Sequence, residues 1–164
     1  MENINTLKAK IDTKVTKFVL LSVVTGGIYP MMWLYLNQPK LTEHMKNEFV
    51  ARDYPLWLAI VTGFGWLLSD IGIAISDDVT VLDLVARVLS LASTVMVIVW
   101  AFKAKTALQA YALNEFKFEL KMNPFYTFIF SIYYIVYCIN DMESELQKHN
   151  IIYSKQISCL NDCK

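Results

Sequence analysis

Basic residues are nearly absent from the apolar parts of this 164-residue chain. Hydrophobic residues make up 55% of it, and of its 15 Lys and Arg residues only Arg87 lies inside an apolar run. The four apolar runs are residues 18–36, 56–75, 79–102 and 124–139. Because two of these runs are about as long as the ~20-residue helix that crosses a bilayer, the sequence predicts an all-α integral membrane protein.

The sequence also lacks the signatures of several other protein classes. Its 15 basic and 15 acidic residues balance, which gives no electrostatic case for a nucleic-acid partner. Cys138, Cys159 and Cys163 are too few for a secreted disulfide framework, so we expect reduced thiols in the cytosol. Cys159 and Cys163 with His149 would supply only three ligands, so no metal site is predicted. There is no phosphate loop, nucleophile elbow or paired-histidine motif, and we therefore expect neither a cofactor nor an enzyme.

The two longest runs predict a central antiparallel transmembrane hairpin with its turn at residues 76–78. Ser76, Asp77 and Asp78 are suited to a tight turn and to capping the helix that follows. The runs at 18–36 and 124–139 add two further apolar helical segments, of which the first is a candidate for re-entry into the same side of the membrane.

Amphipathic helices are expected to flank these runs at the membrane interface. The residues before Phe18 and, more weakly, residues 37–54 combine helically spaced apolar positions with charges. Residues 116–122 alternate apolar and charged side chains, which predicts an extended segment. We expect residues 1–140 to form a single helical membrane domain and residues 141–164 to form a polar, mobile cytosolic tail.

Two topologies follow from the positions of Lys and Arg. Outside the runs these residues number four before residue 18, three in 37–55, none in 76–78, four in 103–122 and three after 139. If all four runs cross, each side receives seven and the positive-inside rule gives no orientation. If the first run re-enters, the split is eleven to three, and if the fourth also re-enters, all fourteen share one side. We expect both termini to be cytoplasmic.

The first run contains residues that break a helix. Thr25, Gly26, Gly27 and Pro30 fall near its middle, where glycine loosens a helix and proline removes a backbone hydrogen bond. The alternative is a kinked helix that still crosses the bilayer. The fourth run has no such residue, but its 16 residues reach only about 24 Å, which leaves crossing and re-entry equally open.

Three ionisable residues, Asp70, Asp83 and Arg87, lie within the central runs at similar depths. Each such charge costs about 2.5 to 3.5 kcal/mol near the bilayer centre, so an intramembrane polar cluster is a candidate functional site. The alternative is structural, because Asp83 and Arg87 are four residues apart and can pair along one helix. We also expect Asp70 to pair with Arg87.

Small residues and aromatic residues mark two further surfaces. A helix-packing seam with 3-4-3-4 spacing is formed by Thr62, Gly65, Ser69, Gly72 and Ser76. This seam suits packing either against the following helix or against a second copy of the chain. Interfacial aromatic side chains are expected at Trp57, Trp100 and Phe102, and along the fourth run at Tyr126, Tyr133, Tyr134 and Tyr137.

The segment from Thr25 to Tyr35 reads T-G-G-I-Y-P-M-M-W-L-Y. It resembles the first span, T-x-G-I-Y-x-x-x-W-x-Y, of a family of small bacterial inner-membrane proteins of unknown function. Tyr29 and Trp33 thereby join the helix-break motif. The segment from Asn123 to Asn140 resembles that family's closing segment, so the likeness frames the chain and leaves the central hairpin unmatched. The resemblance implies a helical protein of the bacterial inner membrane and no particular activity.

Three functions are consistent with this sequence. The first is a non-enzymatic multi-pass membrane protein that acts by binding lipids, a membrane protein or a second copy of itself. The second is an immunity protein that protects the membrane against a pore-forming or depolarising toxin. The third is a small oligomeric transporter or ion pathway that uses Asp70, Asp83 and Arg87.

Overall fold

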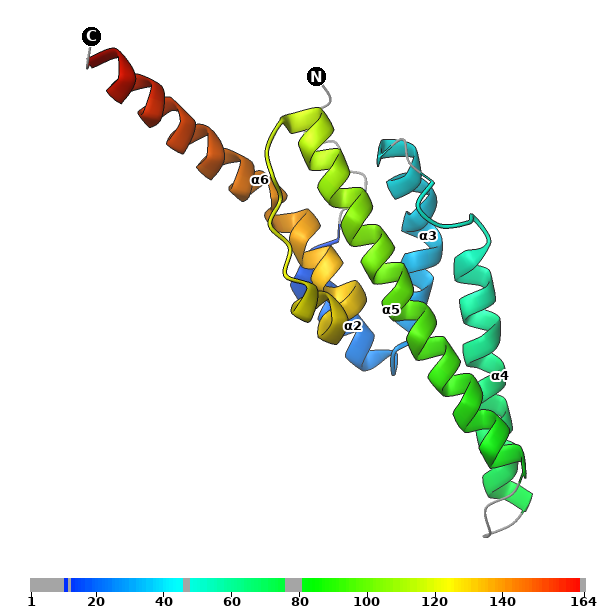
Figure 1. Cartoon of the computed structure of the whole chain (residues 1–164). Helices are drawn as coiled ribbons and strands as arrows, with labels where there is room; N and C mark the ends of the chain where they lie inside the picture. The colour runs from blue at the N-terminus through cyan, green and yellow to red at the C-terminus, as the bar shows by residue number, and fades with distance from the viewer. Residues whose placement is uncertain (1–10, 12, 46–47, 76–80, 163–164) are drawn as a thin grey trace.

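A computed structural model describes residues 11, 13–45, 48–75 and 81–162 (Figure 1). Every regular element in this part of the chain is a helix, which confirms the all-helical prediction. The described helices are α2 (Val15–Val24), α3 (Ile28–Met45), α4 (Tyr54–Ile75), α5 (Val81–Phe116) and α6 (Pro124–Asp162).

Helices α4 and α5 pack side by side (Figure 1). They are antiparallel, since the Tyr54 hydroxyl at the start of α4 donates to the Met96 carbonyl, 2.8 Å away, whereas Gly65 further along α4 lies against Leu89. At 1.5 Å per residue α4 is about 33 Å long and α5 about 54 Å. Helix α4 thus matches the ~30 Å hydrocarbon core of a bilayer, and α5 exceeds it. The predicted turn at residues 76–78 lies outside the described residues.

Both helices are apolar and yet poorly covered by the rest of the protein. Both are long and apolar enough to cross a membrane, and only 22% of the residues in the apolar stretch of each are buried. Their exposed side chains are large and apolar, as at Phe64, Trp66, Leu84 and Leu91. The core helix of a soluble protein would instead be mostly buried.

Helix α3 runs further than the sequence predicts. It continues beyond the apolar run, through Pro39, to Met45, so residues 37–54 do not form a separate interfacial helix. Proline costs this helix a backbone hydrogen bond. The face that carries Leu34, Leu41 and Met45 is buried in the core, and this packing holds the helix together across Pro39.

Helix α6 also continues past its predicted end. The tail expected to be mobile from residue 141 is helical as far as Asp162, and in Figure 1 it extends away from the other helices. Met142 is fully buried and Leu146 packs against the core, so the first turns of this extension are anchored. Further out, the Lys148 ammonium lies 2.7 Å from the Glu145 carboxylate, and this hydrogen bond raises the pKa of Lys148.

The segment between α5 and α6 is extended, as its alternating pattern predicts. Phe118, Leu120 and Met122 are buried, whereas the three charged residues between and before them, Lys117, Glu119 and Lys121, are exposed. The Gln109 side-chain amide donates to the Leu120 carbonyl, 3.0 Å away, and ties the segment to α5.

The expected band of interfacial aromatic residues is only partly on the surface. Trp57 and Phe102 are exposed, but Trp100 is fully buried and lies 6.2 Å from Phe49, measured between ring centroids. The prediction for Trp100 was therefore wrong. Residue 49 belongs to the loop before α4, and this loop covers a position that the apolar run alone makes look lipid-facing.

Candidate functional site: two broken helices beside a helix pair

The first apolar run is divided into two helices at the predicted glycines. Helix α2 ends at Val24 and α3 begins at Ile28. Gly26 and Gly27 have φ angles of 59° and 92°, which side chains other than glycine disfavour. The Thr25 hydroxyl donates to the Leu21 carbonyl at 2.7 Å and accepts the Tyr29 amide N–H at 3.0 Å. One side chain therefore bonds both to the Leu21 carbonyl of α2, which also accepts the Thr25 N–H, and to a free amide of the first turn of α3.

The remaining residues of the helix-break motif hold the start of α3 in place. Pro30 is buried in the first turn, where its missing N–H costs no helical hydrogen bond. Trp33 is almost fully buried, and its indole Nε1 donates to the Thr13 hydroxyl, 3.0 Å away. The motif thus builds a helix-turn-helix unit and ties it to the segment that precedes α2.

The fourth apolar run is also broken, although its sequence contains neither glycine nor proline after Pro124. Ser131 has φ 40° and ψ −110°, and this kink divides α6 into a short leg, residues 124–130, and the long remainder. Asn123 caps the short leg, because its side-chain oxygen accepts the Phe125 N–H at 2.9 Å. The Asn123 N–H donates to the Tyr134 hydroxyl at 3.0 Å, so the leg is tied to the residues beyond the kink.

The two broken runs interlock around Phe18, which is fully buried. Its ring makes edge-to-face contacts with Tyr29, Trp33 and Tyr133, at centroid distances of 5.5, 5.4 and 5.2 Å. The Asn140 side-chain amide donates to the carbonyl of Thr13 at 2.9 Å. In Figure 1 α2 and the start of α6 lie next to each other beside α5, and their contacts agree.

The predicted aromatic anchors of the fourth run gather beside this junction. Tyr126 lies 5.9 Å from Tyr134, and the rings of Tyr134 and Tyr137 are stacked at 6.4 Å, each measured between centroids. Together with Tyr133 and Phe130 they line an almost wholly apolar depression. Such rings with polar tips suit the boundary between lipid and water.

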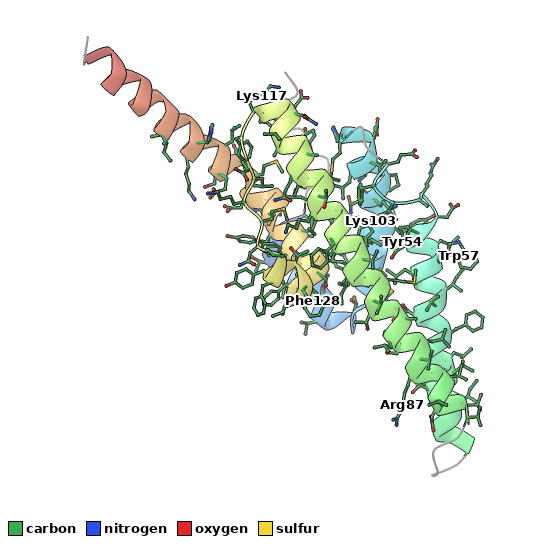
Figure 2. All side chains as sticks on the ribbon, viewed as in Figure 1. Tyr54, Trp57, Arg87, Lys103, Lys117 and Phe128 are labelled. Carbon is green, nitrogen blue, oxygen red and sulfur yellow. The ribbon has the colours of Figure 1, made fainter. Side chains whose placement is uncertain are left out.

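The residues of the predicted intramembrane polar cluster lie on the surface of the α4–α5 pair. Asp70 and Arg87 are exposed, and Asp83 is half-buried. Figure 2 shows the Arg87 side chain pointing away from α4. In the part of the chain that the structure describes, no ion pair joins Arg87 to either aspartate. An ion pathway through these residues would therefore need other chains to enclose it.

The small-residue seam lies largely within the helix pair. Thr62, Gly65 and Gly72 are buried and Ser69 is half-buried, while Ser76 is outside the described residues. A Cβ on Gly65 would lie 3.4 Å from the Leu89 Cβ of α5. Of the two interpretations of the seam, the structure therefore favours packing against the following helix at this position.

Several residues of this junction carry no signal in the sequence. Thr13 and Phe18 lie far from Asn140 in the sequence, and only the fold brings Asn140 to them. Ser131 is an ordinary residue for a helix interior, and nothing in its neighbours marks the kink. The sequence pattern finds the glycine break because that backbone conformation requires glycine.

The described chain is thus an all-helical protein with two helices long and apolar enough to cross a membrane. It belongs to the family described as domain of unknown function DUF4234, whose model matches residues 13–110, more than half of the chain. The match includes the helix-break motif, α4 and most of α5, so the family extends over the helix pair that the sequence resemblance left unmatched. It ends before the closing segment. Neither a curated protein nor a solved structure matches the chain.

Proposed function

We propose that this chain is an integral protein of the bacterial inner membrane that acts by binding lipids or membrane proteins, without catalysis. In this proposal α4 and α5 cross the bilayer, while the two broken runs enter one leaflet and return. The observation that carries the proposal is the exposed apolar surface of α4 and α5, of which so little is buried. Lipid is the surrounding that makes such a surface favourable.

The two helix breaks support the part of the proposal in which both broken runs enter one leaflet and return to the same side. A run broken at its middle can enter and leave the same leaflet, and both runs are broken, at Gly26 and Gly27 and at Ser131. With both runs returning, all fourteen Lys and Arg residues outside the runs share one side, as the positive-inside rule favours. This side would be the cytoplasm, together with both termini.

The resulting shape suggests how the protein acts. The protein would be wide in the cytoplasmic leaflet, which would hold three apolar elements: the α2–α3 unit, the start of α6, and the part of the α4–α5 pair near Tyr54. Only α4 and α5 would reach the other leaflet. A binding platform of this kind offers lateral grooves to lipids and to other membrane helices, and it requires no reactive group.

Membrane fractionation followed by photo-cross-linking tests this function. The full chain is expressed in bacteria with a photoreactive phenylalanine analogue at Leu91, which is exposed on α5, or at Ser144, which is exposed on α6. We expect the protein to remain in membranes washed with alkaline carbonate, and we expect Leu91 adducts to contain lipid or a membrane protein while Ser144 adducts do not. Recovery of the chain in the soluble fraction would refute the proposal.

A further inference from the structure

Two cavities lie one after the other along the side of α3 that faces α4 and the loop before it, and together they are called the α3–α4 cleft. The cavity nearer Ile28 measures about 520 Å³ and has an almost wholly apolar lining that includes Met32 and Tyr35 of α3 and Ala59, Gly63 and Trp66 of α4. A Cβ on Gly63 would meet nothing within 4 Å, so this glycine faces open space.

The cleft becomes polar at its upper end. A second cavity, of about 330 Å³, is lined by Gln38, Thr42 and Glu43 of α3 and by Glu48 and Arg52 of the loop that leads into α4. Residues 28, 31, 35, 38 and 42 are spaced three or four apart, with residue 32 beside them, so one face of α3 lines both cavities. The two cavities therefore lie one after the other along the same face of this helix.

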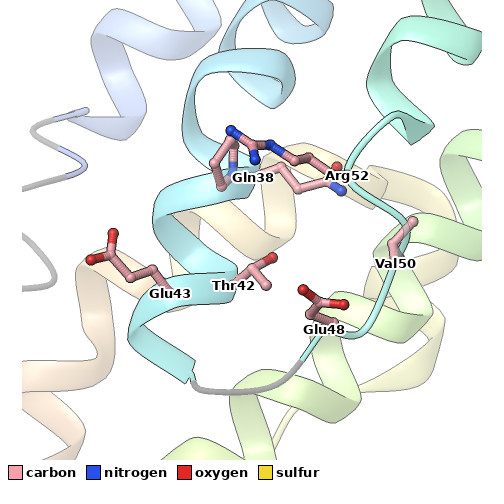
Figure 3. A pocket seen from close by; sticks show the side chains of 7 residues that line it. Gln38, Thr42, Glu43, Glu48, Val50 and Arg52 are labelled. Carbon is pink, nitrogen blue, oxygen red and sulfur yellow. The ribbon is translucent and has the colours of Figure 1, made fainter.

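The polar end carries unpaired groups of both signs. Figure 3 shows Arg52 beside Gln38 at one side of the cavity and Glu48 at the other, with Thr42 between them. Among the described residues, neither Arg52 nor Glu48 forms an ion pair. Gln38 is 1% exposed; its amide N–H donates to the Ala51 carbonyl at 2.9 Å, but its side-chain oxygen has no hydrogen-bond partner. A buried acceptor of this kind normally has a donor.

The length of the cleft matches one lipid leaflet. From Ile28 to Thr42 the α3 axis rises about 21 Å at 1.5 Å per residue. Half of a bilayer with its headgroups is also about 20 to 22 Å thick. An occupant that fills the whole cleft thus needs an apolar chain at the end near Ile28 and a charged group at the end near Thr42.

We propose that the α3–α4 cleft binds a phospholipid whose headgroup carries a primary amine, of the phosphoethanolamine type. Its acyl chain lies over Gly63, its phosphate lies at the Arg52 guanidinium, and its ammonium donates hydrogen bonds to the Glu48 carboxylate and the Gln38 side-chain oxygen. The inference rests on the proposed membrane insertion and specifies which lipid class the protein recognises.

Charge complementarity selects this headgroup over the other common types. A phosphoglycerol headgroup would bring a negative charge to Arg52 but no cation to Glu48. A phosphocholine headgroup carries a cation but no N–H to donate to Gln38. Only a headgroup with both a phosphate and a primary ammonium satisfies all three side chains, and charge-assisted hydrogen bonds are the strong ones.

The test titrates the purified full-length chain in detergent with dioleoyl phosphatidylethanolamine, phosphatidylcholine or phosphatidylglycerol and counts bound lipid by native mass spectrometry. Wild-type protein should bind the ethanolamine lipid at least about tenfold more tightly than the other two, which corresponds to about one charge-assisted hydrogen bond. Glu48→Gln should remove most of this preference, whereas Glu119→Gln, an exposed glutamate outside the cleft, should keep it.

Filling the apolar end gives an independent test. Gly63→Leu should weaken the binding of all three lipids at the cleft, whereas Ala92→Leu, on the exposed surface of α5, should not. Equal affinity for the three headgroups, or a preference that survives Glu48→Gln, would overturn the inference. If the chain stays in carbonate-washed membranes and still shows no preference, only this inference fails. If the chain is soluble, the proposed function fails first.

Discussion

Replacing Phe18 by alanine should separate the two broken runs. The ring is fully buried and contacts Tyr29 and Trp33 of the first run and Tyr133 of the fourth. No other residue of α2 has ring contacts to both runs among those described. The substitution removes these contacts and leaves a cavity at the point where the segments meet.

The expected loss of stability follows from the burial of Phe18 and from the number of rings that it contacts. Truncation of a buried phenylalanine to alanine costs about 3 to 5 kcal/mol through lost contacts and the cavity. Phe18→Leu keeps an apolar side chain of similar reach and should lose mainly the ring geometry, worth about 0.5 to 1.5 kcal/mol for each pair. Phe128→Ala is the matched control, since this phenylalanine is 57% exposed (Figure 2) and should change stability little.

The assay is thermal unfolding of the full chain in detergent, followed by the fraction that stays monodisperse. Phe18→Ala should lower the midpoint most, Phe18→Leu less, and Phe128→Ala least. A cycle with Tyr133→Leu should show coupling to Phe18, because residues in direct contact are not additive. Equal midpoints for Phe18→Ala and Phe128→Ala, or an additive cycle, would refute the proposed junction.

Three further predictions concern the turn, the helix pair and the charged residues. Gly27→Ala should destabilise by about 1 to 2 kcal/mol because its φ is positive, whereas Gly63→Ala should be neutral or stabilising by up to about 1 kcal/mol; urea titration in mixed micelles distinguishes them. Gly65→Leu should lower the free energy of unfolding by about 1 to 3 kcal/mol because the larger side chain overpacks against α5. Gly63→Leu should lower it much less, as a comparison of the two unfolding midpoints would show. The losses of unfolding free energy caused by Asp70→Asn and by Arg87→Gln should add within about 0.5 kcal/mol. A larger coupling in the double variant would contradict the absence of an ion pair between these two side chains.

The helical class and the main helices could be predicted because their causes are local. Long apolar runs and their boundaries are properties of composition, and Gly26 and Gly27 mark a backbone conformation that other residues disfavour. The alternation at residues 116–122 predicted an extended segment, and residues 117–123 between α5 and α6 are not helical. Each of these predictions depends on residues that are close in the sequence.

The predictions that failed depend on tertiary packing. Helix α3 passes through Pro39 because its buried face holds it, and Trp100 is covered by a loop that starts about fifty residues earlier in the chain. The kink at Ser131 has no local cause that we can identify in the sequence. The polar lining of the α3–α4 cleft could not be found from spacing either, since Arg52 and Gln38 meet only through the fold.

The most direct test of the account is the accessibility of single cysteines to a membrane-impermeant maleimide in intact cells. The cysteines are placed at Glu43, Asp78, Glu115 and Ser144 in a background that lacks the three native cysteines. The account predicts labelling at Asp78 alone, with the other three labelled only after the membrane is opened. Labelling of Asp78 and Ser144 together would mean that the fourth run crosses, and labelling of Glu43 and Glu115 with Asp78 protected would put both connecting segments outside the cell. Either result would contradict the account.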